Sequence, residues 1–325
     1  IMVKIILFLC IIIICIIISN LINENYNNNL PNIIWINNRN KDAWETDYIL
    51  NNILKNKYRK QIFDINDNIL NNNINNNIIV FSSNNVSYNK ILKIVKNLKP
   101  KLVIHLSDEF GTYNNYINLS NYCKLYARQY YHNNYDYSLC NKNNILYLPL
   151  AYNTGMMETN YKDIKLKLPT KRKYKWSFIG SIKNDREEMI NTMDSIKPNF
   201  HDSGIDKQEM RDIYRDSIFV CNGRGNFKLD CFRLYEASIC GAIPIVMSSK
   251  DEYDNTFKYM NNPPWLRFDS WEEAREKCNY LLENDMDKLN NQHRKLIKWW
   301  DKLDNKIKNK INNILLIYLL LNILI

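Results

Sequence analysis

Residues 218–247, IFVCNGRGNFKLDCFRLYEASICGAIPIVM, contain two apolar runs that are separated by glycines and a helical pattern. The runs at 218–220 and 243–247 are short and typical of buried strands. Between them, apolar residues at helical spacing predict a helix that Asp230 caps and Gly241 ends. A strand, a helix and a strand in this order form the unit of a parallel sheet covered by helices.

The loop between the first strand and this helix has the features of a phosphate site. Gly223 and Gly225, on either side of Arg224, allow the backbone to approach a ligand closely, and the helix behind them offers unpaired N–H groups. Arg233 and Glu236 are three residues apart and share a face of the helix. One charge suits a phosphate and the other a ribose. The alternative is that the two residues pair with each other.

A second glycine turn follows the strand predicted at 176–179. Gly180 and Ser181 precede a helix that begins near residue 185 and carries Arg186 in its first turn. Such a turn places backbone donors beneath a phosphate, although most glycines between a strand and a helix only turn the chain. We therefore include all three residues among the candidate donor contacts.

The first half of the chain repeats the strand and helix pattern. We expect strands at 32–36, 78–82, 102–106, 122–131 and 145–150, and helices at 43–58 and 88–98. Ligands of parallel sheets bind beyond the carboxyl ends of strands, which is where Asp108 and Glu109 fall. Both are candidates for the catalytic base or for contacts to an acceptor. Alternatively, they cap the next element.

Four segments follow from these patterns: an N-terminal domain at 31–150, a linker at 151–173, a C-terminal domain at 174–283 and C-terminal helices with an apolar tail at 284–325. We expect a solvated loop at 251–254, a strand at 265–268, and helices at 270–283 and 286–300. The tail at 314–325 is either a helix packed on the body or a peripheral membrane contact.

The N-terminus is apolar from residue 5 to 18, and Leu21 and Ile22 extend this run. We interpret residues 1–22 as an uncleaved signal anchor that contacts the membrane through residues 3–22, with a stem at 23–30. The alternative is a cleaved signal peptide. Lys4 on the cytoplasmic side gives a single-pass type II protein that faces the Golgi or ER lumen, if the source is eukaryotic.

Charge and motifs exclude several classes of protein. The 325 residues are 46% hydrophobic and 12% aromatic, which excludes a disordered chain, and the net charge of +10 attracts anions. We expect no nucleic-acid partner, because the sequence has no aromatic and basic motif. Neither a P-loop, a Cys/His cluster nor a convincing Asp-x-Asp is present, so we expect no metal and no cofactor. Of the cysteines, two spaced pairs either form disulfides or remain buried thiols: Cys123 with Cys140, and Cys221 with Cys231.

The run GRGNFKLDCFRLYEASICGAIPIV resembles the nucleotide-sugar segment of exostosin-like glycosyltransferases, including ribitol xylosyltransferase-type proteins. The resemblance is strongest over 176–265, with echoes at 102–111 and 125–152. It implies an α/β protein of the GT-B type, in which two Rossmann-like domains face a cleft. It also implies that Glu236 binds the donor ribose and that Arg224, Lys228 and Arg233 lie near the pyrophosphate.

These observations predict a hexosyl- or pentosyltransferase. It would move a sugar from a nucleotide sugar, with a UDP-sugar as the expected donor, to a hydroxyl of a glycan or glycoprotein, without a metal ion. The alternative is a tethered sugar-binding protein or a degenerate, non-catalytic relative of the transferases.

Overall fold

The computed structural model describes residues 32–37, 44–55, 58–64, 77–83, 86–111 and 114–323. The expected anchor and stem lie outside these ranges, so both stay predictions. Among the described residues, no helix combines the length and the apolar character needed to span a membrane.

The N-terminal domain is built on a six-stranded sheet in which every pairing is parallel. Its strand order is β2-β1-β3-β4-β5-β6, so the chain enters near one edge and then crosses the sheet in sequence. The strands are β1 (Asn32–Asn37), β2 (Arg59–Asp64), β3 (Asn77–Ser82), β4 (Leu102–Leu106), β5 (Leu125–Arg128) and β6 (Ile145–Tyr147). The alternating pattern of the sequence predicted this parallel sheet.

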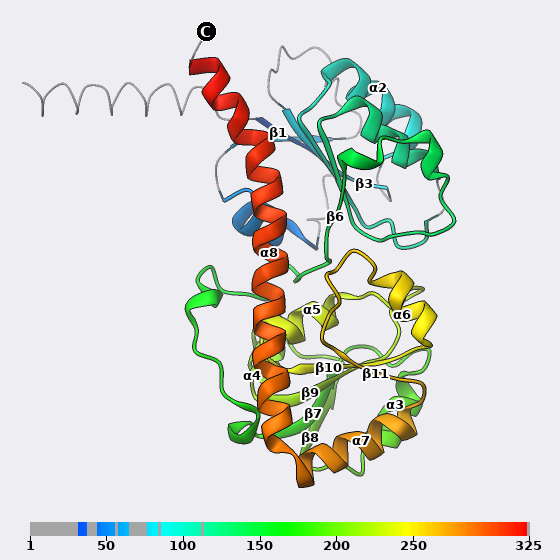
Figure 1. The fold of residues 1–325 in the computed structure, drawn as a ribbon, viewed down its shortest axis with the longest axis vertical. Helices are drawn as coiled ribbons and strands as arrows, with labels where there is room; N and C mark the ends of the chain where they lie inside the picture. The colour runs from blue at the N-terminus through cyan, green and yellow to red at the C-terminus, as the bar shows by residue number, and fades with distance from the viewer. Residues whose placement is uncertain are drawn as a thin grey trace, which may run out of the picture.

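The C-terminal domain contains a second parallel sheet, of five strands in the order β11-β10-β9-β7-β8. Its strands are β7 (Tyr174–Ile179), β8 (Asn199–Asp202), β9 (Ser217–Asn222), β10 (Ile243–Met247) and β11 (Leu266–Phe268). The organising stretch of the sequence forms β9, α5 and β10, two neighbouring central strands and their connecting helix. The two domains lie one above the other in Figure 1.

Helices cover both sheets. They are η1 (Tyr48–Ile53, a π-helix), α2 (Tyr88–Leu98), η3 (Asn114–Tyr122, a 3-10 helix), α3 (Arg186–Met193), α4 (Lys207–Arg215), α5 (Phe232–Ile239), α6 (Lys250–Thr256), α7 (Trp271–Asn284) and α8 (Met286–Ile323). In the C-terminal domain, Met189 of α3 and Trp271 of α7 pack with Trp176 of β7 in one buried cluster. A larger core is continuous between the domains and includes Ile104 of β4 and Tyr235 of α5.

Helix α8 ties the two domains together. It runs from the far end of the C-terminal domain past the N-terminal sheet (Figure 1), and it is one helix of 38 residues. Asp304 on α8 is fully buried, and its Oδ1 accepts a hydrogen bond of 2.7 Å from Asn52 Nδ2 of η1. Lys308 donates to Asn52 and to Asp304, at 2.7 Å each. This polar cluster fixes the helix against the N-terminal domain.

Several elements differ from the sequence-based expectations. Residues 251–254 belong to helix α6 rather than to a solvated loop, because Ser249 caps its first turn by accepting from the Glu252 N–H at 3.2 Å. The helix expected at 43–58 is shorter in the structure, where it consists of η1 and the turn that precedes it. Residues 314–323 of the expected tail continue α8, and the first of them, Ile314 and Leu315, pack partly buried against the core. The six cysteines in the described part of the chain are free, so neither candidate disulfide forms.

Candidate active site

A cavity of about 270 Å³ lies between the domains, at the carboxyl ends of β4, β5, β7 and β9. Loops after parallel strands form binding sites at this edge, because several loop ends converge there. Its N-terminal wall includes Trp44, Glu109, Tyr130, Leu150 and Asn153; its C-terminal wall includes Gly180, Ser181, Lys183, Arg186, Met210, Tyr214, Gly225, Asn226, Asp230, Cys231, Phe232, Arg233 and Glu236. Seven of the eleven candidate residues of the sequence therefore line one cavity.

Arg233 is the second residue of α5, and several contacts hold its side chain in place. Its Nε and one terminal nitrogen donate to the Ile179 carbonyl at 3.0 and 2.9 Å, and the guanidinium lies 4.7 Å from the centre of the Phe178 ring. Gly180 adopts a φ of +150°, and a Cβ at this position would lie 2.5 Å from the guanidinium. The glycine is therefore required for Arg233 to sit against the end of β7.

Arg186 approaches the same aromatic ring from α3. Its guanidinium is 5.5 Å from the Phe178 ring centre, and its Nη1 donates to the Ser181 carbonyl at 2.7 Å. Its side chain is buried, and Nε has no hydrogen-bond partner in the described structure. Burial and the cation of Arg233 lower the pKa of Arg186. Two arginines therefore share one side of the cavity.

Neither arginine forms an ion pair with any carboxylate among the described residues, within 4.0 Å. Buried charges are normally paired, because taking an unpaired ion out of water is costly. Arg186, which is buried, and Arg233, which is partly buried, are therefore available to bind an anion in the cavity.

Glu236 lies further along α5 and also lines the cavity. Its Oε1 accepts from the backbone N–H of Asn153 at 3.0 Å and from the Asn153 side chain at 2.8 Å. Burial raises the pKa of Glu236, and the two Asn153 donors oppose that shift. Glu236 and Arg233 are not ion-paired in the described structure, so the alternative in which each serves only to neutralise the other does not hold.

Three basic or glycine positions of the organising loop lie outside this cavity: Gly223, Arg224 and Lys228. Both terminal nitrogens of Arg224 bond Glu252, at 2.5 and 2.6 Å, and its backbone N–H donates to Asp185. Lys228 lines a neighbouring cavity instead. The arginine that the glycines suggested as a phosphate ligand is therefore held in a structural ion pair.

The two carboxylates expected after β4 have different surroundings. Asp108 is buried and bonds Arg128 and the Tyr135 hydroxyl within its own domain, away from the cavity lining. Glu109 crosses the cleft, and its Oε1 accepts from the backbone N–H groups of Phe227 and Lys228 at 2.9 and 3.2 Å. Glu109 therefore links the N-terminal domain to the glycine loop.

Asp230 is the functional candidate that the sequence pattern did not identify. The pattern assigned it to capping α5, but the residue at the N-cap is Cys231. Asp230 lines both the main cavity and its neighbour, and its Oδ1 is buried without a hydrogen-bond partner in the described structure. Burial, and to a lesser degree the charge of Glu109, raises the pKa of Asp230 to about 7.

Tyr130 lies at the centre of this group of acids. Burial and the charges of Asp230, Glu109 and Glu45 raise the pKa of the Tyr130 hydroxyl. Its φ of +53° is unusual for a bulky residue, and strained backbone clusters at functional sites. Of this cluster the sequence pattern identified only Glu109, because the members come from four separate segments. Among the described residues, no group of three or more His, Cys, Asp or Glu side chains is arranged to hold a metal ion.

Comparison with known proteins connects this cleft to a class of fold. No family model and no curated protein matches the sequence. The structure is similar to an α-glucosyltransferase solved with UDP and a 13-mer DNA, with a TM-score of 0.54 and 12% identity over 87% of this chain and 99% of that one. It is also similar to HepE from Anabaena solved with UDP, with a TM-score of 0.54 and 8% identity over 87% of this chain and 98% of that one.

At these identities the likeness is one of fold. Two parallel α/β domains on either side of a cleft are the architecture of GT-B glycosyltransferases. This agrees with the fold that the sequence predicted. The narrower exostosin-like resemblance stays a prediction. The chain therefore has the fold of the GT-B glycosyltransferases.

Proposed function

We propose that this protein is a glycosyltransferase that moves a sugar from a nucleoside diphosphate sugar to an acceptor hydroxyl. The observation that carries the proposal is a pair of arginines, the buried Arg186 and the partly buried Arg233, which line the cleft without a carboxylate partner in the described structure. Two adjacent fixed cations suit a diphosphate. A UDP-sugar is the donor we favour, because two structures with the same fold were solved with UDP.

Each part of the donor has a matching group in the cavity. The diphosphate lies against Arg186 and Arg233, both of which line the cavity. Glu236 accepts hydrogen bonds from the ribose hydroxyls, as the resemblance to exostosin-like enzymes implies. Asn153 fixes the orientation of this carboxylate through two hydrogen bonds.

Transfer forms a bond between the acceptor oxygen and the anomeric carbon, and it breaks the bond from that carbon to the diphosphate. The acceptor proton passes to Asp230, whose position between two cavities and whose pKa of about 7 suit a general base. The negative charge of the departing nucleoside diphosphate is stabilised by the two arginines, without a metal ion. Glu109 keeps the glycine loop against the N-terminal domain.

Titration calorimetry with UDP-, GDP- and CDP-sugars tests donor binding, and product analysis with and without EDTA tests transfer. We expect one nucleotide sugar to bind and to be consumed, with most activity kept in EDTA. Binding without turnover supports a non-catalytic sugar-binding protein instead. Activity that EDTA abolishes and Mn²⁺ restores contradicts the metal-independent mechanism.

A further inference from the structure

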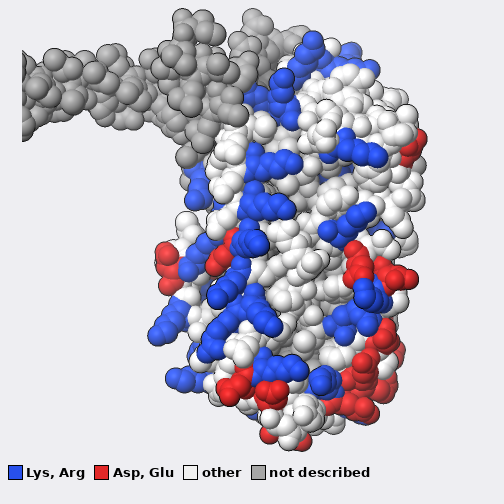
Figure 2. Space-filling view, in the orientation of Figure 1, with Lys and Arg blue, Asp and Glu red and all other residues white. Residues whose placement is uncertain are grey.

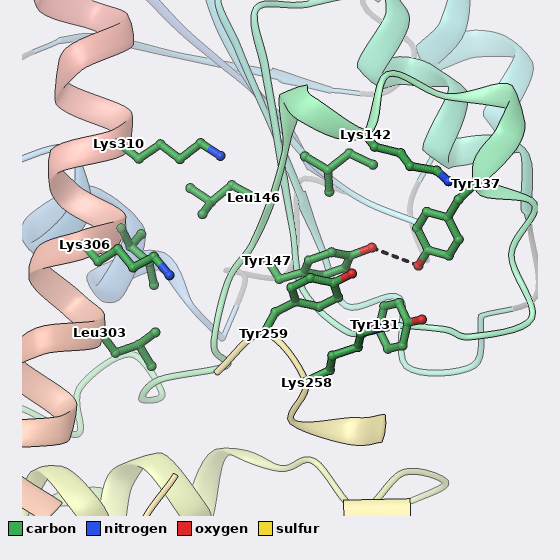
Figure 3. A pocket seen from close by; sticks show the side chains of 12 residues that line it. Tyr131, Tyr137, Lys142, Leu146, Tyr147, Lys258, Tyr259, Leu303, Lys306 and Lys310 are labelled. Carbon is green, nitrogen blue, oxygen red and sulfur yellow. Dashed lines mark hydrogen bonds between the residues drawn. The ribbon is translucent and has the colours of Figure 1, made fainter. Parts of the chain in front are cut away.

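A second cavity, of about 360 Å³, lies between α8 and the N-terminal domain. We call it the Tyr–Lys cavity. Its lining consists of four tyrosines, four lysines and four aliphatic residues: Tyr131, Tyr137, Tyr147, Tyr259, Lys142, Lys258, Lys306, Lys310, Ile145, Leu146, Leu303 and Ile307. Figure 3 shows Lys306 and Lys310 extending from α8 toward the tyrosine cluster.

The tyrosines form a rigid wall. The rings of Tyr147 and Tyr259 stack with their centres 4.3 Å apart, and Tyr131 meets Tyr259 edge-on at 5.2 Å. The Tyr147 hydroxyl donates to that of Tyr137 at 2.8 Å (Figure 3). Together with the four aliphatic side chains, these rings give the cavity a largely apolar surface.

The lysines give the cavity a positive charge that no described carboxylate neutralises through an ion pair. Its lining contains neither Asp nor Glu, and none of the four lysines is ion-paired in the described part of the chain. Burial and the neighbouring Lys306 lower the pKa of Lys310. Figure 2 shows further lysine and arginine side chains along the line of α8, and most acidic side chains of this face in the lower half of the view.

The linings of three cavities overlap between this site and the donor cleft. An intermediate cavity of about 200 Å³ shares Tyr131 with the Tyr–Lys cavity, and it shares Tyr130 and Asp230 with the donor cavity. Its other lining residues are Asn133, Asn255 and Thr256, together with the charged Lys228 and Glu252. Amides and hydroxyls form hydrogen bonds with sugar hydroxyls, whereas the Tyr–Lys cavity has no Asn, Gln, Ser or Thr in its lining.

We propose that the Tyr–Lys cavity binds the phosphate and first chain segment of a lipid-linked saccharide, which is the acceptor of the transferase. This inference rests on the proposed function. The saccharide occupies the intermediate cavity with its free hydroxyl at Asp230, the phosphate meets the lysines, and the lipid chain contacts the aliphatic residues. The order of the three linings, from arginines through amides to lysines with apolar walls, matches the order of chemical groups from donor to lipid.

A lipid phosphate fits this cavity better than a nucleic-acid strand or a free anion does. A nucleic-acid strand presents phosphates and flat bases but no chain that requires Ile145, Leu146, Leu303 and Ile307 at the wall. A free anion requires only the lysines. Beyond Lys310, α8 also leads directly into the apolar sequence 314–325, which brings the cavity close to a segment suited to a membrane surface.

The test is photo-crosslinking of the full-length protein in neutral detergent with a benzophenone-bearing prenyl phosphate, followed by peptide mapping. We expect labelling within residues 258–259 and 303–310, because these line the cavity. An unlabelled prenyl phosphate should compete about tenfold better than the matching prenyl alcohol, since each charge-assisted contact is worth about one factor of ten. Inorganic phosphate and a single-stranded oligonucleotide should compete weakly.

Substitution of Lys306→Ala together with Lys310→Ala should reduce labelling about tenfold. Lys298→Ala, an exposed lysine of α8 outside the cavity lining, should leave labelling unchanged. Equal competition by the alcohol shows an apolar site only, and strongest competition by the oligonucleotide shows a nucleic-acid site. Either result overturns the proposal, as does labelling outside the cavity.

Nucleotide-sugar binding in the same sample separates the two proposals. If the donor binds but the prenyl phosphate does not label the cavity, the lipid acceptor is wrong and the transferase proposal stands. If the cavity is labelled and no nucleotide sugar binds, the proposed function fails while the lipid-phosphate site remains.

Discussion

At the scale of single residues, the proposed mechanism depends on the raised pKa of Asp230. Its pKa, raised to about 7 by burial, lies above the value of an exposed aspartate, so the carboxylate that can accept a proton forms only as the pH rises through about 7. We therefore expect kcat/KM for transfer to increase with pH across this range. Asp230→Asn should lower the rate by about a hundredfold or more, because it removes the base.

Glu45 provides the matched control for this prediction. Burial raises its pKa to about 7 as well, but Glu45 does not line the donor cavity. Glu45→Gln should keep the rise of kcat/KM with pH, measured by initial rates between pH 5 and 9. If Glu45→Gln removes that rise and Asp230→Asn keeps it, the assignment of the base is wrong.

At the residue scale, the sequence placed Arg233 and Glu236 on one face of α5, and both line the cavity, but it did not identify Asp230 as a site residue. Arg233 and Glu236 were predictable, because helical spacing places them on one face and the following glycine fixes the length of the helix. Asp230 was not, because an aspartate before a helix usually caps it, and only tertiary structure shows that Cys231 takes that position. The flanking glycines and the resemblance assigned Arg224 to the donor site, which stays a prediction; its ion pair with Glu252 was not predictable, because the sequence indicated a loop at 251–254.

At the scale of elements, α8 is held by one buried polar cluster. Asp304 has no exposed surface and is bonded by Asn52, Lys162 and Lys308. Removing the carboxylate leaves the buried ammonium of Lys308 without a counterion. Asp304→Ala should therefore lower the free energy of unfolding by about 3 to 5 kcal/mol, as is typical when one partner of a buried pair is removed.

Urea denaturation measures this change, and Asp301→Ala is its control, because Asp301 is exposed on the same helix. An equal, small effect of both substitutions would show that the cluster does not fix α8. The sequence could not predict this cluster, since Asn52 and Asp304 are 252 residues apart.

Elements with a clear apolar period were predicted closely, whereas polar ones were missed. The bounds of α2, β4 and β10 agree with the sequence pattern, because each buries a regular set of apolar residues. Strand β8 is an edge strand without a fully buried residue, and helix α4 buries only Ile213 and Tyr214, so neither has a long apolar pattern. Burial therefore decides which elements a single sequence can reveal.

At the scale of the whole molecule, the described residues form two domains that share a core and a connecting helix, and residues 1–22 are not among the described residues. Deleting residues 1–22 should yield a protein that remains soluble without detergent and keeps its melting temperature, because the proposed anchor contributes nothing to the core. Light scattering and thermal unfolding of the truncated protein measure both properties. Aggregation of the truncated protein, while the full chain folds in detergent, would show that the segment is structural.

The two-domain arrangement followed from the alternation of strands and helices and from the resemblance, but the contents of the cleft did not. Sequence patterns report which face of an element is buried, not which loops of two domains meet. The Tyr–Lys cavity illustrates this limit. Its lining residues come from α8, from the chain around β5 and β6 and from the loop after α6, so no local sequence motif predicts them.

The donor site is the central claim, and donor affinity of two arginine variants tests it most directly. Arg233→Ala removes an unpaired cation from the cavity, so calorimetric titration with the nucleotide sugar should show a Kd raised about tenfold to a hundredfold. Arg224→Ala breaks the ion pair with Glu252 outside the cavity and should leave the Kd unchanged. A Kd that Arg224→Ala raises and Arg233→Ala does not, with both proteins folded, would contradict the account.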